Sequence, residues 1–301
     1  MKKYFTPPRI AGALCIIIAI LAYFAGRFDF KIFLLGAAGI VLVSINTKYA
    51  QSSFDDFIGT FKRWQTIVIT ALYDAIFWLL LVFSAQFYQW KVQAKMLQTQ
   101  TSTMLTQAGL ADAAQLSQNV TSLRSFLTVI IAGVVLLILF NLITYTISRG
   151  LIWTNIAEKK PTKKFLLKFL GLNSLWWLIW IPIIFIILIT LKLSGALKGS
   201  FTLVMTIAAF FTPILHTLYM NGRGLRSIGQ SFGLGFSKLF KFAVPYCFAY
   251  IVLVIILVPT TIIFSLWPVR QPTMQAISMM IAVPWMAWLR IYLYPVIKKL
   301  M

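Results

Sequence analysis

Long apolar segments recur along the whole chain and are separated by shorter polar ones. A membrane-spanning helix needs about 20 predominantly apolar residues, and the segments that approach this length predict eight spans. The predicted spans cover residues 9–26, 31–47, 65–89, 125–147, 173–192, 200–220, 242–265 and 275–297. The first two are short and are joined by a tight turn, so they form either two full spans or a hairpin that crosses only partly. The pattern therefore predicts an all-α, polytopic transmembrane helical bundle.

The connection between the third and fourth spans, residues 90–124, is polar but regularly patterned. Its apolar positions recur at alternating steps of three and four on two arms, which predicts that both spans continue outward as a two-helix protrusion with a shared seam. The alternative is a disordered loop rich in Gln and Thr. Asn119 opens an Asn-Val-Thr sequon, which is compatible with a glycan on this loop. The predicted seam consists of Trp90, Ala94, Leu97, Thr101 and Met104 on the first arm and Ala113, Leu116, Val120, Leu123 and Leu127 on the second.

Composition supports the membrane class and charge sets the orientation. The chain of 301 residues is 60% hydrophobic and 11% charged, whereas soluble domains carry about 25% charged residues, so a soluble enzyme is excluded. The net charge of +21 indicates the positive-inside rule and attraction to anionic lipid headgroups rather than binding of nucleic acid, which is not expected. Most Lys and Arg residues fall on the side of both termini. We therefore expect a protein of the cell (plasma) membrane with both termini in the cytoplasm.

The chain also contains a repeated pattern. Two Phe residues four positions apart, with Lys nearby, precede three outward spans at Phe57/Phe61, Phe165/Phe169 and Phe232/Phe236, which predicts three amphipathic helices in the cytoplasmic interface. The proposed repeat contains an interfacial helix, an outward span, an outer loop and an inward span. The predicted divisions are an N-terminal transmembrane hairpin (1–50) and repeats at 51–158, 159–227 and 228–301, the first of which carries the protrusion. The alternative is that aromatic and basic residues simply mark the edges of any membrane protein.

The three inward spans end alike, with a Tyr followed four residues later by Lys or Arg. A Tyr ring suits the membrane interface, and a cation beyond it can reach the headgroups. The residues predicted to anchor in the headgroups are Tyr145, Arg149, Lys163, Lys164, Lys168, Tyr219, Arg223, Lys238, Lys241, Tyr294 and Lys298.

Polar residues inside four of the spans form a candidate cluster. Asp74, Asn141, His216 and Arg290 are placed at similar depths from the cytoplasmic side. We expect Asp74 to pair with Arg290, because burial of either charge alone costs several kcal/mol. A polar ring of these four residues would be a functional site. The alternative is one structural ion pair and two hydrogen bonds between helices.

No catalytic, cofactor or metal site is predicted. His216 is the only His, and Cys15 and Cys247 lie in apolar runs, so neither a haem nor a His-rich metal site is expected. Asp55 and Asp56 precede the first predicted interfacial helix, where acids favour a helix N-terminus. The Gly-rich segment 222–235 lacks the Gly-Lys-Ser/Thr ending of a phosphate-binding loop.

Residues 147–177 and 222–245 carry a family resemblance. With their basic and aromatic linkers they resemble a group of polytopic membrane proteins common in archaea, which are similar to the membrane domain attached to some glycerophosphoryl diester phosphodiesterases. The resemblance covers roughly residues 50–301 and implies an array of helical hairpins. The hydrolase domain of those enzymes binds metal through Glu, Asp and His, and nothing in this chain matches it. The resemblance thus implies a membrane module without the catalytic module.

These observations favour a non-enzymatic membrane scaffold or accessory subunit of a membrane complex. The protrusion is expected to bind a protein partner, and the basic interfacial helices are expected to hold anionic lipid. The alternative is a small-molecule transporter or a lipid-handling protein, which would use the polar cluster and the prolines that interrupt the later spans.

Overall fold

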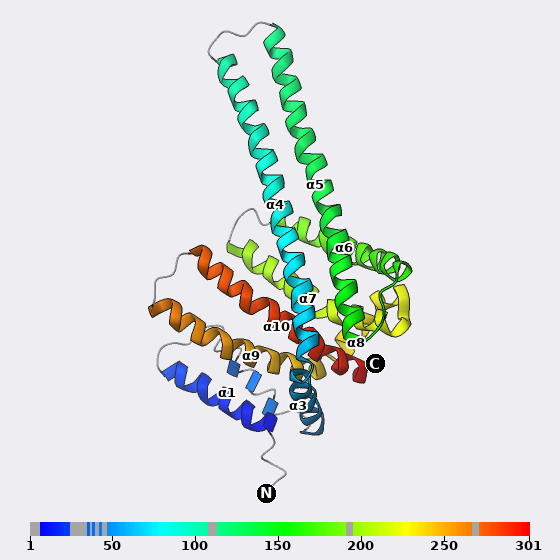
Figure 1. The fold of residues 1–301 in the computed structure, drawn as a ribbon. Helices are drawn as coiled ribbons and strands as arrows, with labels where there is room; N and C mark the ends of the chain where they lie inside the picture. Colours follow the sequence, from blue (N-terminus) through cyan, green and yellow to red (C-terminus); the bar gives the residue numbers. More distant parts are fainter. Residues whose placement is uncertain are drawn as a thin grey trace. The chain divides into compact units, whose positions relative to one another are not determined.

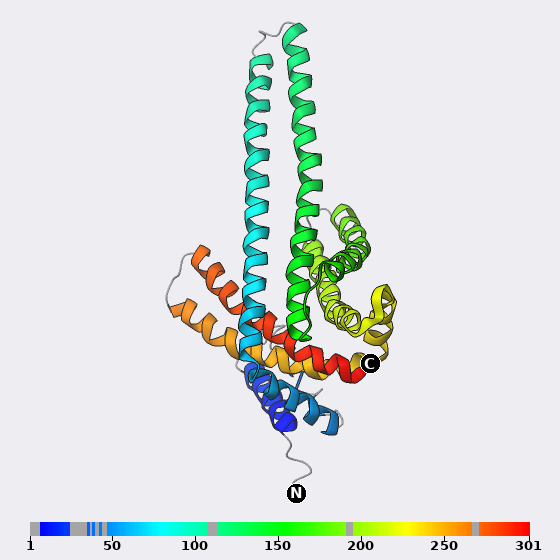
Figure 2. The same ribbon diagram turned by 45° about the vertical axis from the view of Figure 1, so that its right-hand side comes forward.

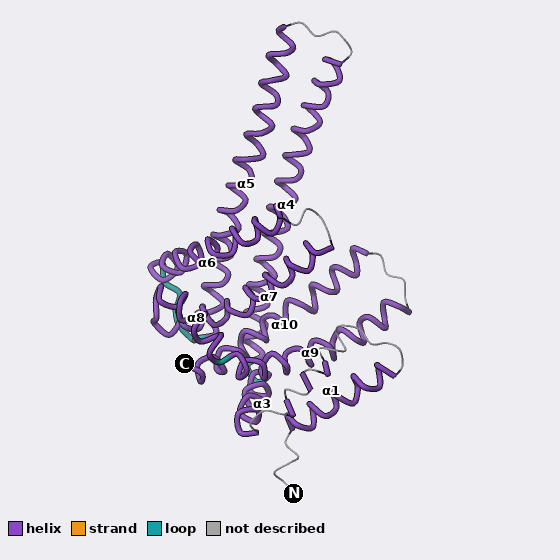
Figure 3. Tube along the Cα trace, turned by 180° about the vertical axis from the view of Figure 1, so that it is seen from behind, coloured by secondary structure: helices purple, strands orange, loops and turns teal. Residues whose placement is uncertain are grey.

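The computed structural model describes residues 7–24, 47–107, 113–190, 195–266 and 271–301, with short pieces at 35–36, 38–39 and 42–43. Side chains are described for fewer residues, and those of 98–107 and 113–119 are not among them. Within the described ranges the chain is helical apart from short turns and contains no strand (Figure 3).

Among the described residues, six helices are long and apolar enough to cross a membrane, which confirms the third to eighth predicted spans. The protein is therefore an all-α, polytopic integral membrane protein. Helix α1 (Pro7–Phe24) contains a shorter apolar stretch, and most of the predicted second span lies outside the described residues. The six helices are α4 (Trp64–Gln107), α5 (Ala113–Ile156), α6 (Lys163–Thr190), α7 (Gly195–Leu218), α9 (Leu239–Leu266) and α10 (Gln271–Leu300).

Two of the three predicted amphipathic segments form separate helices. Helix α3 (Thr47–Phe61) ends in a turn before α4, and α8 (Ser227–Ser237) ends at Lys238 before α9. The segment with Phe165 and Phe169 instead belongs to α6 and runs into the span without a break. Thr162 caps this helix by accepting a hydrogen bond from the backbone N–H of Phe165 (3.1 Å). A single glycine, Gly171, follows the Phe pair, and an isolated Gly is tolerated inside a helix.

The chain forms two compact units. The first contains residues 1–72, 152–160 and 175–301, and the second contains residues 73–151 and 161–174. In the first unit, α3 packs against α1, α9 and α10, and α7 packs against α8 and α10. In the second unit, the described core is built from the paired parts of α4 and α5 and from the first turns of α6. Phe169 is fully buried in this unit beside Gly150.

Helices α4 and α5 are 44 residues long each. At 1.5 Å per residue each measures about 66 Å, about twice the thickness of the hydrocarbon core of a bilayer. Their parts in the second unit run antiparallel and side by side (Figures 1 and 2). The helix continues through 90–107 and again from 113 to 124, so the two arms between spans three and four are helical rather than a disordered loop. Within α4 no Gly or Pro interrupts the helix.

Candidate functional site

A buried ion pair joins α4 to α5 in the second unit. Arg149 donates a hydrogen bond from its guanidinium to the carboxylate of Asp74. Only 7% and 1% of the two side chains are exposed. The guanidinium also lies 5.2 Å from the ring centroids of Phe77 and Tyr145, in cation–π contact. Charge and aromatic contacts thus stabilise Arg149 at a position from which water is excluded.

This arrangement corrects one prediction. Arg149 was expected to anchor in lipid headgroups, but its side chain is buried and paired with Asp74. The sequence pattern of a Tyr followed by a cation is the same at Arg149 and Arg223. It therefore cannot tell that Arg149 pairs with the carboxylate of Asp74 on another helix. The expected pairing of Asp74 with Arg290 stays a prediction, because Arg290 belongs to the other unit.

The remaining members of the predicted polar cluster lie on both units. Asn141 belongs to the second unit, where the Ser84 hydroxyl donates to its Oδ1 at 3.5 Å, a long hydrogen bond between α4 and α5. His216 belongs to the first unit and is buried, with its ring 5.6 Å from that of Trp153. The contact of Asn141 is a hydrogen bond between two helices, as the structural alternative expects. The polar cluster of Asp74, Asn141, His216 and Arg290 stays a prediction.

The predicted seam of the protrusion is not packed where its side chains are described. Trp90, Ala94, Leu97, Val120, Leu123 and Leu127 are all exposed, which contradicts close packing at these positions. Thr101, Met104, Ala113, Leu116 and Asn119 have side chains outside the described set. The described contact between the arms lies nearer the middle of the helices. There the Tyr88 hydroxyl donates to the carbonyl of Ile130 (3.2 Å), and a Cβ at Gly133 would lie 2.4 Å from the Tyr88 ring.

Aromatic and basic side chains lie together on α4 where its apolar part ends, towards Gln107. The Lys91 ammonium lies 4.8 Å from the ring centroid of Trp90 and 5.5 Å from that of Phe87. Trp with a neighbouring cation is typical of the membrane–water interface. From Lys91 to the end of the helix at Gln107, α4 extends for about a further 24 Å. This length is the helical part of the predicted protrusion on the first arm.

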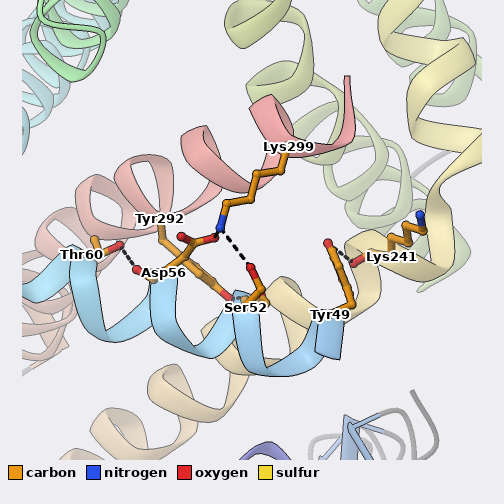
Figure 4. A network of polar contacts seen from close by, with 8 residues as sticks. Tyr49, Ser52, Asp56, Thr60, Lys241, Tyr292 and Lys299 are labelled. Atoms are coloured by element: carbon orange, nitrogen blue, oxygen red, sulfur yellow. Dashed lines mark hydrogen bonds and ion pairs between the residues drawn. The ribbon is translucent and has the colours of Figure 1, made fainter. Parts of the chain in front are cut away.

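A polar network fixes α3 to α9 and α10 in the first unit, and we call it the α3 junction (Figure 4). The Tyr49 hydroxyl donates to the carbonyl of Lys241 (3.1 Å). The hydroxyls of Ser53 and Tyr292 share a hydrogen bond of 2.7 Å in a buried position. The Lys299 ammonium donates to Asp56 Oδ2 at 2.7 Å and to Ser52 Oγ at 3.1 Å.

The α3 junction corrects the interpretation of Asp55 and Asp56 as acids at a helix N-terminus. Helix α3 begins at Thr47 and has no acid in its first turn. Asp56 lies in its second half and pairs with Lys299. Burial, and to a lesser extent the charge of Asp56, raise the pKa of Tyr49 to about 12. Sequence reasoning missed the junction because its partners are more than 190 residues apart.

Aromatic packing covers the same face of α3. The Phe57 ring lies between 5.4 and 5.8 Å from the rings of Phe248, Trp288 and Tyr292. Phe232 packs in the same way on Trp176 (5.4 Å) and Phe211 (4.7 Å). The second Phe of each pair also contacts protein, Phe61 on Trp288 (5.7 Å) and Phe236 on Phe211 (5.2 Å), but both of these side chains are more than half exposed.

Most of the other predicted headgroup anchors lie near helix ends, whereas Tyr145 lies inside α5. The lysines and the arginine among them are exposed at Lys163, Lys164, Lys168, Arg223, Lys241 and Lys298, and Lys238 is half-buried, as are Tyr145, Tyr219 and Tyr294. Lys159, which the anchor pattern does not include, donates to the carbonyl of Met220. This carbonyl belongs to the π-helical turn η1 (Tyr219–Arg223), where the regular helix is interrupted.

Neither a metal-binding group nor a known relative indicates what the protein does. Within the described residues, no group of three or more His, Cys, Asp or Glu side chains is placed to hold a metal ion. No family model, curated protein or solved structure matches the chain.

Proposed function

We propose that the protein is a non-enzymatic membrane scaffold or accessory subunit of a membrane complex. Its helical protrusion faces outward and binds a protein partner. Its basic cytoplasmic side holds anionic lipid. The resemblance stated from sequence, to the membrane domain attached to some glycerophosphoryl diester phosphodiesterases, implies the same kind of membrane module without a catalytic one.

The observation that carries the proposal is the exposed apolar surface of the protrusion. Met96 lies beyond Lys91 on α4 and is 48% exposed, and Val120 lies beyond Arg124 on α5 and is 68% exposed. Outside the bilayer such side chains face water. Val120 and Leu123 are both exposed and lie three residues apart, on one face of α5. A contiguous exposed apolar surface is typical of protein interaction sites. A partner that covers them removes this cost, at about 25 cal/mol per Å² of apolar surface.

The charge distribution supports the lipid contact. No acidic residue follows Glu158, although many Lys and Arg residues do. Of these later cations, Lys299 has an ion pair with a carboxylate in the α3 junction. Anionic headgroups attract basic side chains near the membrane by about 1 kcal/mol each. Anionic lipid headgroups can therefore neutralise the Lys and Arg residues that follow Glu158.

The experiment is purification of the tagged chain from its native membranes in mild detergent, followed by mass spectrometry. We expect a stoichiometric protein partner that is lost from the variant Val120→Asp. Gln93→Asp is the matched control, because it adds a charge to an exposed polar position on the same protrusion. Equal recovery of the partner with all three proteins, or recovery of the wild-type chain without a stoichiometric partner, would overturn the proposal.

A second candidate function is transport or lipid handling, and the buried Asp74–Arg149 pair favours it. Ionisable residues within membrane spans often mark substrate or proton pathways. In proteoliposomes, this candidate predicts solute or lipid movement that is lost in the double variant Asp74→Asn/Arg149→Gln. Movement no faster than in protein-free vesicles would remove this candidate.

A further inference from the structure

An open pocket of about 340 Å³ lies within the first unit, beside the turn that joins α7 to α8. Its volume is at the lower end of the range for small-molecule sites. The pocket is lined by Leu218 from α7, by Arg223 from the turn, by Gln230, Gly233, Leu234 and Ser237 from α8, and by Met301. It therefore combines an apolar part with one cation and two neutral polar side chains.

The pocket lies where the turn between α7 and α8 and a glycine of α8 leave room. The turn consists of η1 and a short 3₁₀ helix, η2 (Gly224–Arg226), and two glycines in it have positive φ, Gly222 at +86° and Gly224 at +57°. These values favour Gly. After this turn α8 packs against α7, with the rings of Phe211 and Phe232 4.7 Å apart. On the pocket side α8 presents Gly233, where an added Cβ would meet no atom within 4 Å.

Among the side chains that line the pocket, the charged one is Arg223, whose guanidinium suits an anion. Among the described residues no carboxylate pairs with Arg223, and the nearest acid before it in the sequence is Glu158, which pairs with Arg63 at 3.1 Å. A guanidinium offers several N–H donors in one plane and suits the oxygens of a phosphate. The side-chain amide of Gln230 supplies a further donor in the same lining.

The surroundings of the pocket favour a lipid as the source of that anion. On the segment that supplies most of the lining and on the first turn of α9, large apolar side chains are exposed at Leu225, Phe236 and Phe240, the last by 83%. Arg226, Lys238 and Lys241 lie on the same segment. A helix with exposed apolar side chains and flanking cations is suited to the membrane interface.

We infer that this pocket binds one anionic phospholipid. Arg223 and Gln230 donate hydrogen bonds to the phosphate oxygens, and the apolar part of the lipid contacts Leu218 and Leu234. The inference rests on the proposed lipid contact of the basic side and gives that contact a defined site.

The test is native mass spectrometry of the purified full chain with phosphatidylglycerol, compared with phosphatidylcholine. We expect one phosphatidylglycerol to bind more tightly than phosphatidylcholine. Loss of one cation near the membrane weakens attraction about fivefold, so Arg223→Gln is expected to raise the dissociation constant by about that factor. Gly233→Leu fills the pocket and is expected to abolish the tight site.

Matched controls separate the pocket from general charge and from misfolding. Arg226→Gln removes a neighbouring cation that does not line the pocket, and Gly229→Leu adds the same side chain at another open position of α8. Both controls are expected to retain the tight lipid. Replacement of Gly by Leu inside a helix favours the helical conformation, so the thermal transition of Gly233→Leu is expected to equal or exceed that of the wild type.

Three outcomes would overturn the inference: an unchanged tight site in Gly233→Leu, equal weakening by Arg223→Gln and Arg226→Gln, or complete displacement of the lipid by millimolar inorganic phosphate. The last outcome would identify a soluble phosphate as the ligand. The lipids that co-purify with the chain separate this failure from that of the proposed function. If phosphatidylglycerol is still enriched over phosphatidylcholine among them, the lipid-holding surface stands without the pocket, and if it is not, both fail.

Discussion

The two compact units each contain an ion pair between two different helices, in very different surroundings. In the second unit Asp74 and Arg149 are 1% and 7% exposed, whereas in the first unit Asp56 and Lys299 are 17% and 50% exposed. Removal of one partner from a buried pair leaves an uncompensated charge, but an exposed pair is screened by water and salt. The same charge chemistry is therefore a structural requirement in one unit and a minor contribution in the other.

The difference in exposure also indicates which contacts of the α3 junction contribute most to its stability. Its exposed ion pair adds little, so the aromatic contacts of Phe57 and the buried hydrogen bond between Ser53 and Tyr292 carry most of the attachment of α3. In the second unit, by contrast, the described parts of α4 and α5 expose most of their apolar side chains and meet through a few specific contacts.

The largest expected effect comes from breaking the buried pair. Arg149→Met leaves the Asp74 carboxylate buried without its guanidinium, and we expect the free energy of unfolding to fall by about 3–5 kcal/mol. The double variant Asp74→Asn/Arg149→Met removes both charges and is expected to recover most of this loss. Equilibrium unfolding in detergent measures both. A single variant no less stable than the double would contradict the comparison.

A smaller effect is expected at the buried hydrogen bond of the α3 junction. Tyr292→Phe leaves the Ser53 hydroxyl, which is 2% exposed, without this partner. A buried polar group without its partner costs about 1–3 kcal/mol. The double variant Ser53→Ala/Tyr292→Phe is expected to cost less than Tyr292→Phe alone, measured by the same unfolding experiment. Additive losses would show that the two hydroxyls act independently.

The exposed ion pair is expected to matter less again. Lys299→Met should lower the free energy of unfolding by less than about 1 kcal/mol, and the loss should shrink in high salt. Lys298→Met is the control, because Lys298 is its exposed neighbour outside the Asp56 pair. A loss as large as that of Arg149→Met would remove the distinction between the two pairs.

The smallest expected effect is a shift in the titration of Tyr49. Its pKa is raised to about 12, whereas a Tyr in an unfolded chain ionises near pH 10. The unfolded form therefore loses this proton first, and the contribution to stability is present below pH 10 and is lost as pH rises towards 12. The ultraviolet difference between wild type and Tyr49→Phe should show a phenolate midpoint near pH 12. A midpoint near pH 10 would indicate that α3 is not docked.

The long spans, the helical arms and the separate helices α3 and α8 are all predictable from sequence, because apolar length and the spacing of Phe residues are local signals. The partners of Arg149 and Asp56 are not, because they depend on which distant helix lies opposite. The predicted seam of the protrusion was also only partly predictable. The spacing of Val120 and Leu123 correctly indicates an apolar stripe on one helix face. The same spacing is expected for a stripe that packs within the chain and for one that contacts another protein.

The central claim is that the exposed apolar stripe of the protrusion meets a protein partner. Photo-crosslinking in native membranes tests it most directly, with benzoylphenylalanine in place of Val120 or, as a control, of Leu79, which is 71% exposed on the apolar part of α4. We expect one discrete protein adduct from position 120 and only lipid adducts from position 79. No protein adduct at position 120, or the same adduct from both positions, would contradict it.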